Sequence, residues 1–170
     1  RITQLVLSRN SLASYPVAMA DTATTTEFDL ATAVRPRPDG TTFDIDIDAG
    51  FTVGPKPNGG YLLATAARAV GVALGEAGSS HRDVLAASAT YPWAPDPGPA
   101  VVSVEVVRTG RGASQALATI SQDGRRCVDI TLTLGTLAPS APATWSALPP
   151  VDVAPFDQCV RVPADPPGGA

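Results

Sequence analysis

A short polar, glycine-containing segment precedes the longest apolar run of the chain. Asn58, Gly59 and Gly60 lead into Tyr61 and an almost wholly apolar stretch that ends at Leu74. Asparagine in this place is typical of a helix N-cap, and the first backbone N–H groups of a helix lack intrahelical partners and carry partial positive charge. The segment is therefore a candidate oxyanion site. An ordinary cap followed by two sterically required glycines explains the same residues.

Other polar residues are candidates for a catalytic or binding role. Gln122, in the sequence SQDGR, stands at the predicted end of a strand. Its amide could orient a water molecule by hydrogen bonding, and a structural role is the alternative. Five cations lie in or beside predicted turns: Lys56, Arg108, Arg111, Arg125 and Arg126. They are candidates for phosphate binding, and solvated charges at hairpin ends explain them equally well.

The spacing of other residues argues against metal and triad chemistry. The alternating aspartates of 44–48 suggest a calcium loop, but its sixth and twelfth positions are Ala49 and Pro55 rather than glycine and glutamate. His81 is the one histidine, and no Ser-His-Asp or Cys-His arrangement can be built around it. No Walker or Rossmann glycine spacing is present. We therefore expect neither a metal nor a cofactor.

Composition narrows the class of protein. Hydrophobic residues make up 44% of the 170 residues and charged residues 16%, which favours a folded domain. A net charge of -4 without a basic stripe argues against a nucleic-acid partner. The apolar run is too short to cross a bilayer, so we expect no membrane partner. Two isolated cysteines predict reduced thiols and a cytoplasmic location.

The periodicity predicts one helix and a series of strands. Residues 59–75 have almost no polar face, which predicts a helix buried on all sides. Residues 42–48 alternate between apolar and acidic side chains and predict a half-buried strand, with 31–35 as a possible hairpin partner. The later strands are predicted at 84–93, 100–108, 113–122 and 126–137. In the last of them, Cys127 is expected on the outer face.

This order of elements predicts an α+β hotdog fold, a curved antiparallel sheet wrapped around one long buried helix. The alternative is an open sheet with the helix on one face, but such a helix should keep a polar outer stripe. We expect the hotdog domain at 27–138, an N-terminal extension at 1–26 and a proline-rich linker or tail at 139–170. The sole methionine, Met19, reads as a native start, so residues 1–18 could be an upstream extension.

Three segments carry a family resemblance: PNGGYLLATAARAV at 57–70, YPWAPDPGPA at 91–100 and RTGRGASQALATISQDGR at 108–125. In order and spacing they resemble the N-terminal hotdog of the type II acyl-CoA thioesterases. The resemblance implies hydrolysis of acyl-CoA in fatty acid metabolism. It also implies contact of Tyr61 and Leu62 with the substrate, and a homodimer or pairing with a second hotdog domain.

The same resemblance places the catalytic aspartate, glutamine and threonine or serine in the second hotdog. Gln122 looks like a first-domain counterpart of that glutamine, whereas the helix at 59–75 has no Asp or Glu. We therefore expect this chain alone to be weakly active or inactive. A non-catalytic acyl-binding protein and a purely structural half are the alternatives.

Overall fold

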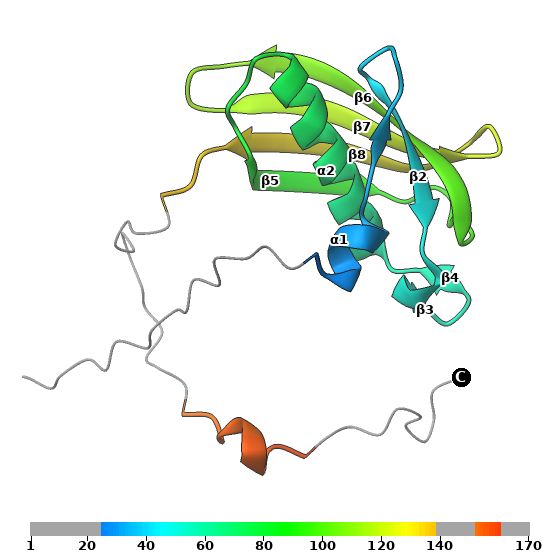
Figure 1. Cartoon of the computed structure of the whole chain (residues 1–170), viewed down its shortest axis with the longest axis vertical. Helices are drawn as coiled ribbons and strands as arrows, with labels where there is room; N and C mark the ends of the chain where they lie inside the picture. Colours follow the sequence, from blue (N-terminus) through cyan, green and yellow to red (C-terminus); the bar gives the residue numbers. More distant parts are fainter. Residues whose placement is uncertain (1–24, 139–151, 161–170) are drawn as a thin grey trace, which may run out of the picture.

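The computed structural model describes residues 25–138 and 152–160. Residues 25–138 form a curved antiparallel sheet with one long helix against its concave face (Figure 1). This is the predicted α+β hotdog fold. Residues 1–24, 139–151 and 161–170, which hold most of the predicted extension and linker, lie outside the described residues. Within 152–160 there is one short 3-10 helix, η2 (Phe156–Gln158).

The main sheet has six strands, and each neighbouring pair is antiparallel. Their order across the sheet is β1 (Arg35–Pro36), β2 (Thr42–Ile47), β6 (Gly98–Thr109), β7 (Ser114–Gln122), β8 (Arg125–Gly135) and β5 (Asp83–Thr90). A separate ribbon joins β3 (Thr52–Val53) to β4 (Lys56–Pro57) just before the long helix, after a 3-10 turn, η1 (Ala49–Phe51). The two edge strands of the main sheet are therefore β1 and β5.

Strand β2 follows its predicted alternation. Phe43, Ile45 and Ile47 are buried against the helix side of the sheet. The aspartates between them face outward, and Asp44 pairs with Arg37 across the hairpin, which lowers the pKa of the Asp44 carboxyl through that hydrogen bond. Asp44 and Asp46 therefore belong to the solvated side of β2, whereas Asp48 follows the strand and caps η1 by accepting the Gly50 N–H.

The predicted partner strand at 31–35 is wrong. The chain instead forms a short helix, α1 (Glu27–Ala31), and only Arg35–Pro36 pairs with β2. The helix is favoured because Thr26 and Asp29 cap each other's backbone amides in a capping box. Pro36 has no backbone N–H to extend the ladder, so β1 stays short.

In β8 the apolar side chains face inward as predicted, but Cys127 is buried rather than outward. The pairing of β7 with β8 shifts register between Ile120 and Ser121. An irregularity of this kind moves the following side chain to the other face. The strict alternation from which the prediction was made is broken at this point.

The long helix, α2 (Gly59–Glu76), begins where predicted and ends one residue later. Asn58 is its N-cap, and Gly78, with φ of 78°, follows its end. The side against the sheet is buried: Tyr61, Leu62, Thr65, Ala66, Ala69, Val70, Ala73 and Leu74. The opposite side is less covered than composition predicted, because its small residues are only half-buried and Arg68 is exposed.

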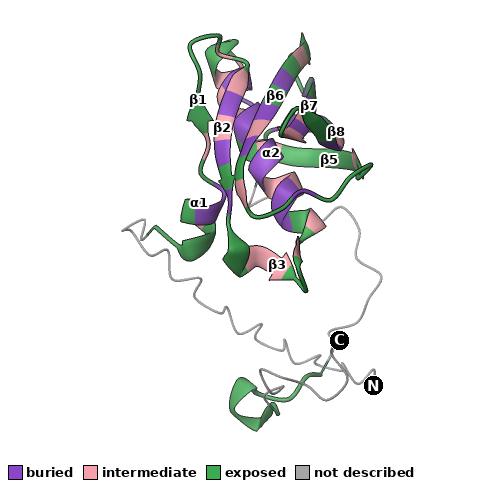
Figure 2. Cartoon of the chain, turned by 90° about the vertical axis from the view of Figure 1, so that its right-hand side faces the viewer, coloured by how far each residue is buried: buried purple, intermediate pink, exposed green. Residues whose placement is uncertain are grey.

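Strand β5 lies at the end of the sheet beyond the cover of α2. Figure 2 shows it exposed along nearly its whole length. Val84 is 43% exposed and Leu85 is 46% exposed, and the pairing with β8 shifts register between Val84 and Ala86. This edge strand ends at Thr90, three residues short of the predicted end.

Candidate active site

The N-terminus of α2 is built as a capped helix start. The Oδ1 atom of Asn58 accepts the N–H of Gly60 at 2.8 Å and the N–H of Tyr61 at 3.2 Å. The carbonyl of Asn58 accepts the N–H of Leu62. Within the described residues, the Gly59 N–H is the amide of this first turn that makes no hydrogen bond. An incoming oxyanion would therefore meet Gly59 first and would have to displace the Asn58 cap to reach the others.

Tyr91 covers the same turn from the loop after β5. Its hydroxyl donates to the carbonyl of Gly59 at 2.8 Å. A Cβ added at Gly59 would come 3.2 Å from the Tyr91 ring, so a larger residue there would push the ring back by a few tenths of an ångström. Tyr91 remains 46% exposed. No local pattern predicts this contact, because 32 residues separate the two positions.

Tyr61 and Leu62 point away from this surface. The Tyr61 hydroxyl donates to the carbonyl of Ala31 at 2.8 Å and accepts the N–H of Asp48 at 3.0 Å. Its ring stacks on Phe51, with ring centroids 5.1 Å apart. Leu62 is 2% exposed. Both side chains belong to the core of this chain, and their contact with a substrate stays a prediction.

Gln122 holds the loop that connects β5 to β6. Its Oε1 atom accepts the N–H of Asp96 at 2.8 Å, and its Nε2 atom donates to the carbonyls of Asp96 at 2.9 Å and Pro99 at 3.2 Å. Lys56 reaches the same loop and pairs with Asp96 at 2.5 Å. Gln122 and Lys56 therefore meet at one anchor near the start of α2. A water bound by Gln122 would compete with these loop contacts.

Arg111 lies far from that anchor. It is in the turn between β6 and β7, next to Ser114, whose hydroxyl is 3.1 Å from that of Ser79 just beyond the end of α2. The N-terminal and C-terminal ends of an 18-residue helix are roughly 27 Å apart. Lys56 and Arg111 are consequently at opposite ends of α2 and do not form one anion site within a single chain.

A buried polar cluster near the end of α2 was missed by the sequence analysis. The Nδ1 atom of His81 is 2.9 Å from the hydroxyl of Ser114, which is fully buried, and the backbone N–H of His81 donates to the Ser79 hydroxyl. No carboxylate joins these three side chains among the described residues. The cluster satisfies buried polar groups and lacks the third member of a triad.

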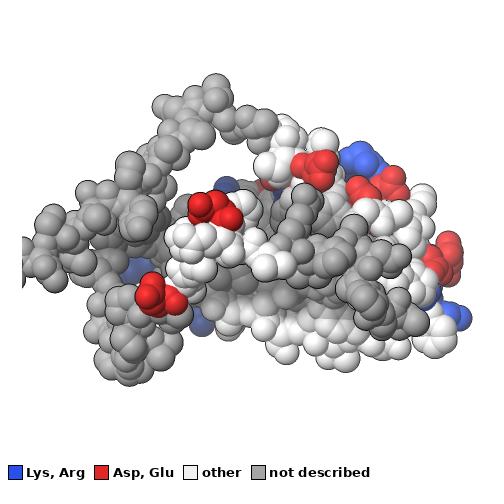
Figure 3. Space-filling view, turned by 90° about the horizontal axis from the view of Figure 1, so that it is seen from below, with Lys and Arg blue, Asp and Glu red and all other residues white. Residues whose placement is uncertain are grey.

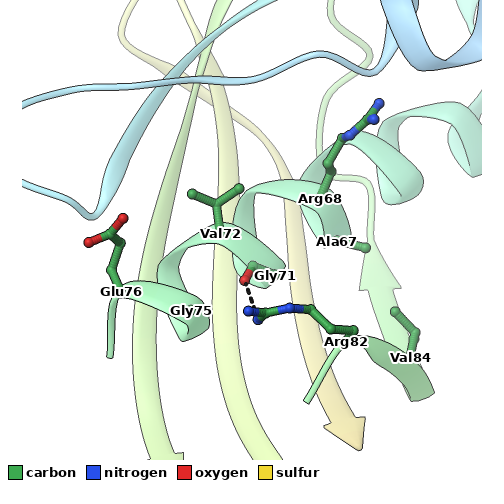
Figure 4. A pocket seen from close by; sticks show the side chains of 8 residues that line it. All are labelled: Ala67, Arg68, Gly71, Val72, Gly75, Glu76, Arg82 and Val84. Carbon is green, nitrogen blue, oxygen red and sulfur yellow. Dashed lines mark hydrogen bonds between the residues drawn. The ribbon is translucent and has the colours of Figure 1, made fainter. Parts of the chain in front are cut away.

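A groove runs between the outer side of α2 and β5. It encloses about 620 Å³ and is lined by Ala67, Arg68, Gly71, Val72, Gly75, Glu76, Arg82 and Val84. Figure 4 shows Arg82 reaching back under the helix to the carbonyl of Gly71, while the guanidinium of Arg68 points away from it. Arg68 instead donates to the Asp29 carbonyl and the Thr32 hydroxyl of the α1 region.

The charge on the described surface is mixed. From the end of the molecule drawn in Figure 3, acidic and basic side chains are scattered among uncharged ones, and this view shows no continuous basic area on the described residues. Within the described ranges, no group of three His, Cys, Asp or Glu side chains is arranged to hold a metal ion. None of the helices described is both long and apolar enough to cross a membrane.

Comparison with known proteins finds relatives of this chain in sequence and in structure. An uncharacterized protein of Mycobacterium tuberculosis is 36% identical over 115 residues, which is 64% of this chain and 40% of that protein. A thioesterase II candidate from Thermobifida fusca superposes with a TM-score of 0.69 and 31% identity, covering 79% of this chain and 48% of that one. A hotdog protein of unknown function from Alicyclobacillus acidocaldarius gives a TM-score of 0.66 and 27% identity, over 85% and 52% of the two chains.

The chain thus spans 40% of the mycobacterial relative and about half of each of the two solved structures. A family model described as the acyl-CoA thioesterase N-terminal domain matches residues 47–135, which is 89 of the 170 residues. The match runs from the end of β2 to the end of β8 and includes the whole of α2. The chain belongs to the acyl-CoA thioesterase N-terminal domain family.

Proposed function

We propose that this chain is one hotdog half of an enzyme that hydrolyses acyl-CoA thioesters, and that a second hotdog domain completes the site. The observation that carries the proposal is the open groove between α2 and β5. An edge strand leaves backbone groups unpaired, and proteins usually remove such edges by pairing. Here the edge adjoins the outer side of α2, which presents the small residues Ala67, Gly71 and Gly75 together with Arg68, Val72 and Glu76. The Arg82 guanidinium lies against Gly71 and Gly75, so a neighbour would contact or displace it.

The chemistry divides between the two halves. In thioester hydrolysis, water attacks the carbonyl carbon and negative charge develops on its oxygen, which backbone N–H donors stabilise. This half offers the Gly59 N–H at the start of α2 for that charge. α2 itself carries no Asp or Glu until Glu76, its last residue, and the nearby Asp96 is held by Lys56. A base that activates the water therefore comes from the second half.

The partner is a second copy of this chain or a hotdog domain from a separate or longer polypeptide. A two-fold contact between copies is the commonest closed arrangement, so we expect purified chains to pair through β5 and the outer side of α2. Light scattering should then give about twice the 17.3 kDa of one chain. A stable monomer at micromolar concentration would contradict pairing between copies.

Gly71→Arg tests the groove directly. A Cβ at Gly71 meets nothing within 4 Å, so the first atom of the new side chain fits without a clash, and arginine is a better helix former than glycine. We expect this variant to lose pairing while its melting temperature stays at least as high as that of the unpaired wild-type chain. Val53→Arg is the matched control, since Val53 is 69% exposed in β3, just before the start of α2 and away from the groove at residues 67–76. Equal pairing of both variants would place the interface elsewhere.

Activity is measured as free thiol released from acyl-CoA. The chain alone should release thiol weakly or not at all, and co-expression with a hotdog half that carries a helix aspartate should restore turnover. Turnover of several per second by this chain alone, near the enzyme median of about 10 per second, would contradict the divided site.

The second candidate function is acyl-CoA binding without hydrolysis. It is favoured by the absence of Asp and Glu from residues 59–75 of α2. The two functions separate in one experiment: titration calorimetry reports binding, and a thiol reagent reports cleavage. Binding that persists without thiol release, even with the partner half present, would support the binding function instead.

A further inference from the structure

An exposed aromatic and cationic pair stands at the same end of the molecule as the start of α2. The guanidinium carbon of Arg125 lies 4.1 Å from the centroid of the Trp93 ring. Trp93 is 55% exposed, so one of the largest apolar side chains of the chain remains in water. Its backbone N–H donates to the carbonyl of Cys127 at 3.3 Å, which fixes the loop against β8.

The pair borders a small polar hollow of about 260 Å³, lined also by Asp96, Gln122 and Asp123. Gln122 holds this part of the loop by its three hydrogen bonds to Asp96 and Pro99. The hollow is therefore bounded by a fixed loop and by a tight turn, in which Asp123 has φ of 52°. A preorganised wall lowers the cost of ordering side chains around a ligand.

The charges around the hollow favour a base rather than a phosphate. Within the described residues, Arg125 makes no ion pair, whereas its neighbour Arg126 is paired with Asp129. Two carboxylates, on Asp96 and Asp123, also line the hollow. Asp96 is paired with Lys56, so it is mainly Asp123 that would repel a phosphate group. A planar guanidinium and an indole stack well on a nucleobase, and a carboxylate accepts a hydrogen bond from an exocyclic amino group.

We infer that Trp93, Arg125 and Asp123 form a stacking subsite for a purine base, and that the base is the adenine of an acyl-CoA. This identification of the ligand rests on the proposed function. The subsite is continuous with the loop that places Tyr91 over Gly59. An acyl-CoA that stacks its adenine here has its flexible arm free to run toward the start of α2.

The test compares coenzyme A with pantetheine, which lacks the nucleotide, by titration calorimetry on the whole chain. Stacking of one base is worth about 1–3 kcal/mol, so Trp93→Leu and Arg125→Gln should each weaken coenzyme A binding about 5-fold or more. Neither should alter pantetheine binding. Arg126→Gln is the matched control, since it removes the same charge from the adjacent residue, which is paired with Asp129, and it should bind coenzyme A like the wild type.

Three results would overturn the subsite: wild-type affinity in both Trp93→Leu and Arg125→Gln, equal weakening by Arg126→Gln, or no coenzyme A binding by the wild-type chain. Thermal melting checks each fold, and Arg125→Gln, at an exposed position, stands alone if Trp93→Leu fails to fold. Failure of the proposed function is seen separately, in the hydrolysis of acyl-pantetheine by the paired halves. That substrate has no adenine, so its turnover does not depend on the subsite.

Discussion

Replacing Tyr61 with phenylalanine tests how the start of α2 is held in place. The change removes one oxygen atom, which donates to the carbonyl of Ala31 and accepts the N–H of Asp48. Ala31 is 5% exposed, so its carbonyl has little access to replacement water. Asp48 is exposed, and its N–H can be solvated again.

A buried polar group left without a partner costs about 1–3 kcal/mol, and the cost here comes mainly from the Ala31 carbonyl. We therefore expect Tyr61→Phe to lower the free energy of unfolding by about 1–3 kcal/mol. Urea unfolding followed by circular dichroism measures this value, and an unchanged denaturant slope would show that the compactness of the two states is unaltered.

Tyr91→Phe is the matched control. It also removes one hydroxyl, but Tyr91 is 46% exposed and makes a single bond, to the Gly59 carbonyl. Its cost should be about 1 kcal/mol or less, because water replaces the lost donor. If Tyr61→Phe is no more destabilising than Tyr91→Phe, the Tyr61 hydroxyl does not tie α2 to α1 and β2, and the reasoning is refuted.

Three other changes test separate parts of the fold. Ala66→Lys places a charge at a fully buried position and should cost several kcal/mol, whereas Ala64→Lys on the half-buried side should cost much less; thermal melting compares them. Gln122→Leu removes the bonds to Asp96 and should speed hydrogen exchange of the Asp96 amide while that of the β7 amides is unchanged. The hydrogen bond from the Thr26 backbone N–H lowers the pKa of the Asp29 carboxyl below its ordinary value of 3.8. The capping box therefore stabilises α1 above that pH, and the stabilisation is lost as the pH falls through the lowered pKa. Hydrogen exchange of the α1 amides should rise in that range, and Asp29→Asn should remove this pH dependence.

The long elements could be predicted because one strong pattern specifies each of them. Asn58 before an apolar run determines where α2 begins, and the alternation around Ile45 determines which side of β2 is buried. The short elements could not be predicted in this way. The sequence TEFD at 26–29 contains a capping box, yet a five-residue helix has too few residues for a hydrophobic period to support it.

The hydrophobic pattern of the sequence also could not predict side-chain contacts between distant segments. His81 and Ser114 are 33 residues apart, and Gln122 and Asp96 are 26 apart. Nothing local to either residue indicates its partner, because the contact depends on the register of whole strands. The candidate site was therefore predicted as a list of residues, and the structure separates that list into a helix start with its loop anchor and the distant Arg111 turn.

The apolar composition of α2 predicts more burial than the described residues provide on the outer side of the helix. A helix that packs against a sheet on one side alone normally has polar residues on its other side. In α2 the outer side has Leu63, Ala67 and Val72 at half-buried positions, where they still pack against the core of this chain. The charged residues on that side, Arg68 and Glu76, are the ones left exposed. Small and branched residues at the margin of a helix–sheet contact have the same apolar character as core residues, so the pattern predicted burial on all sides. The hotdog partner proposed above would bury this margin and the neighbouring β5 edge further.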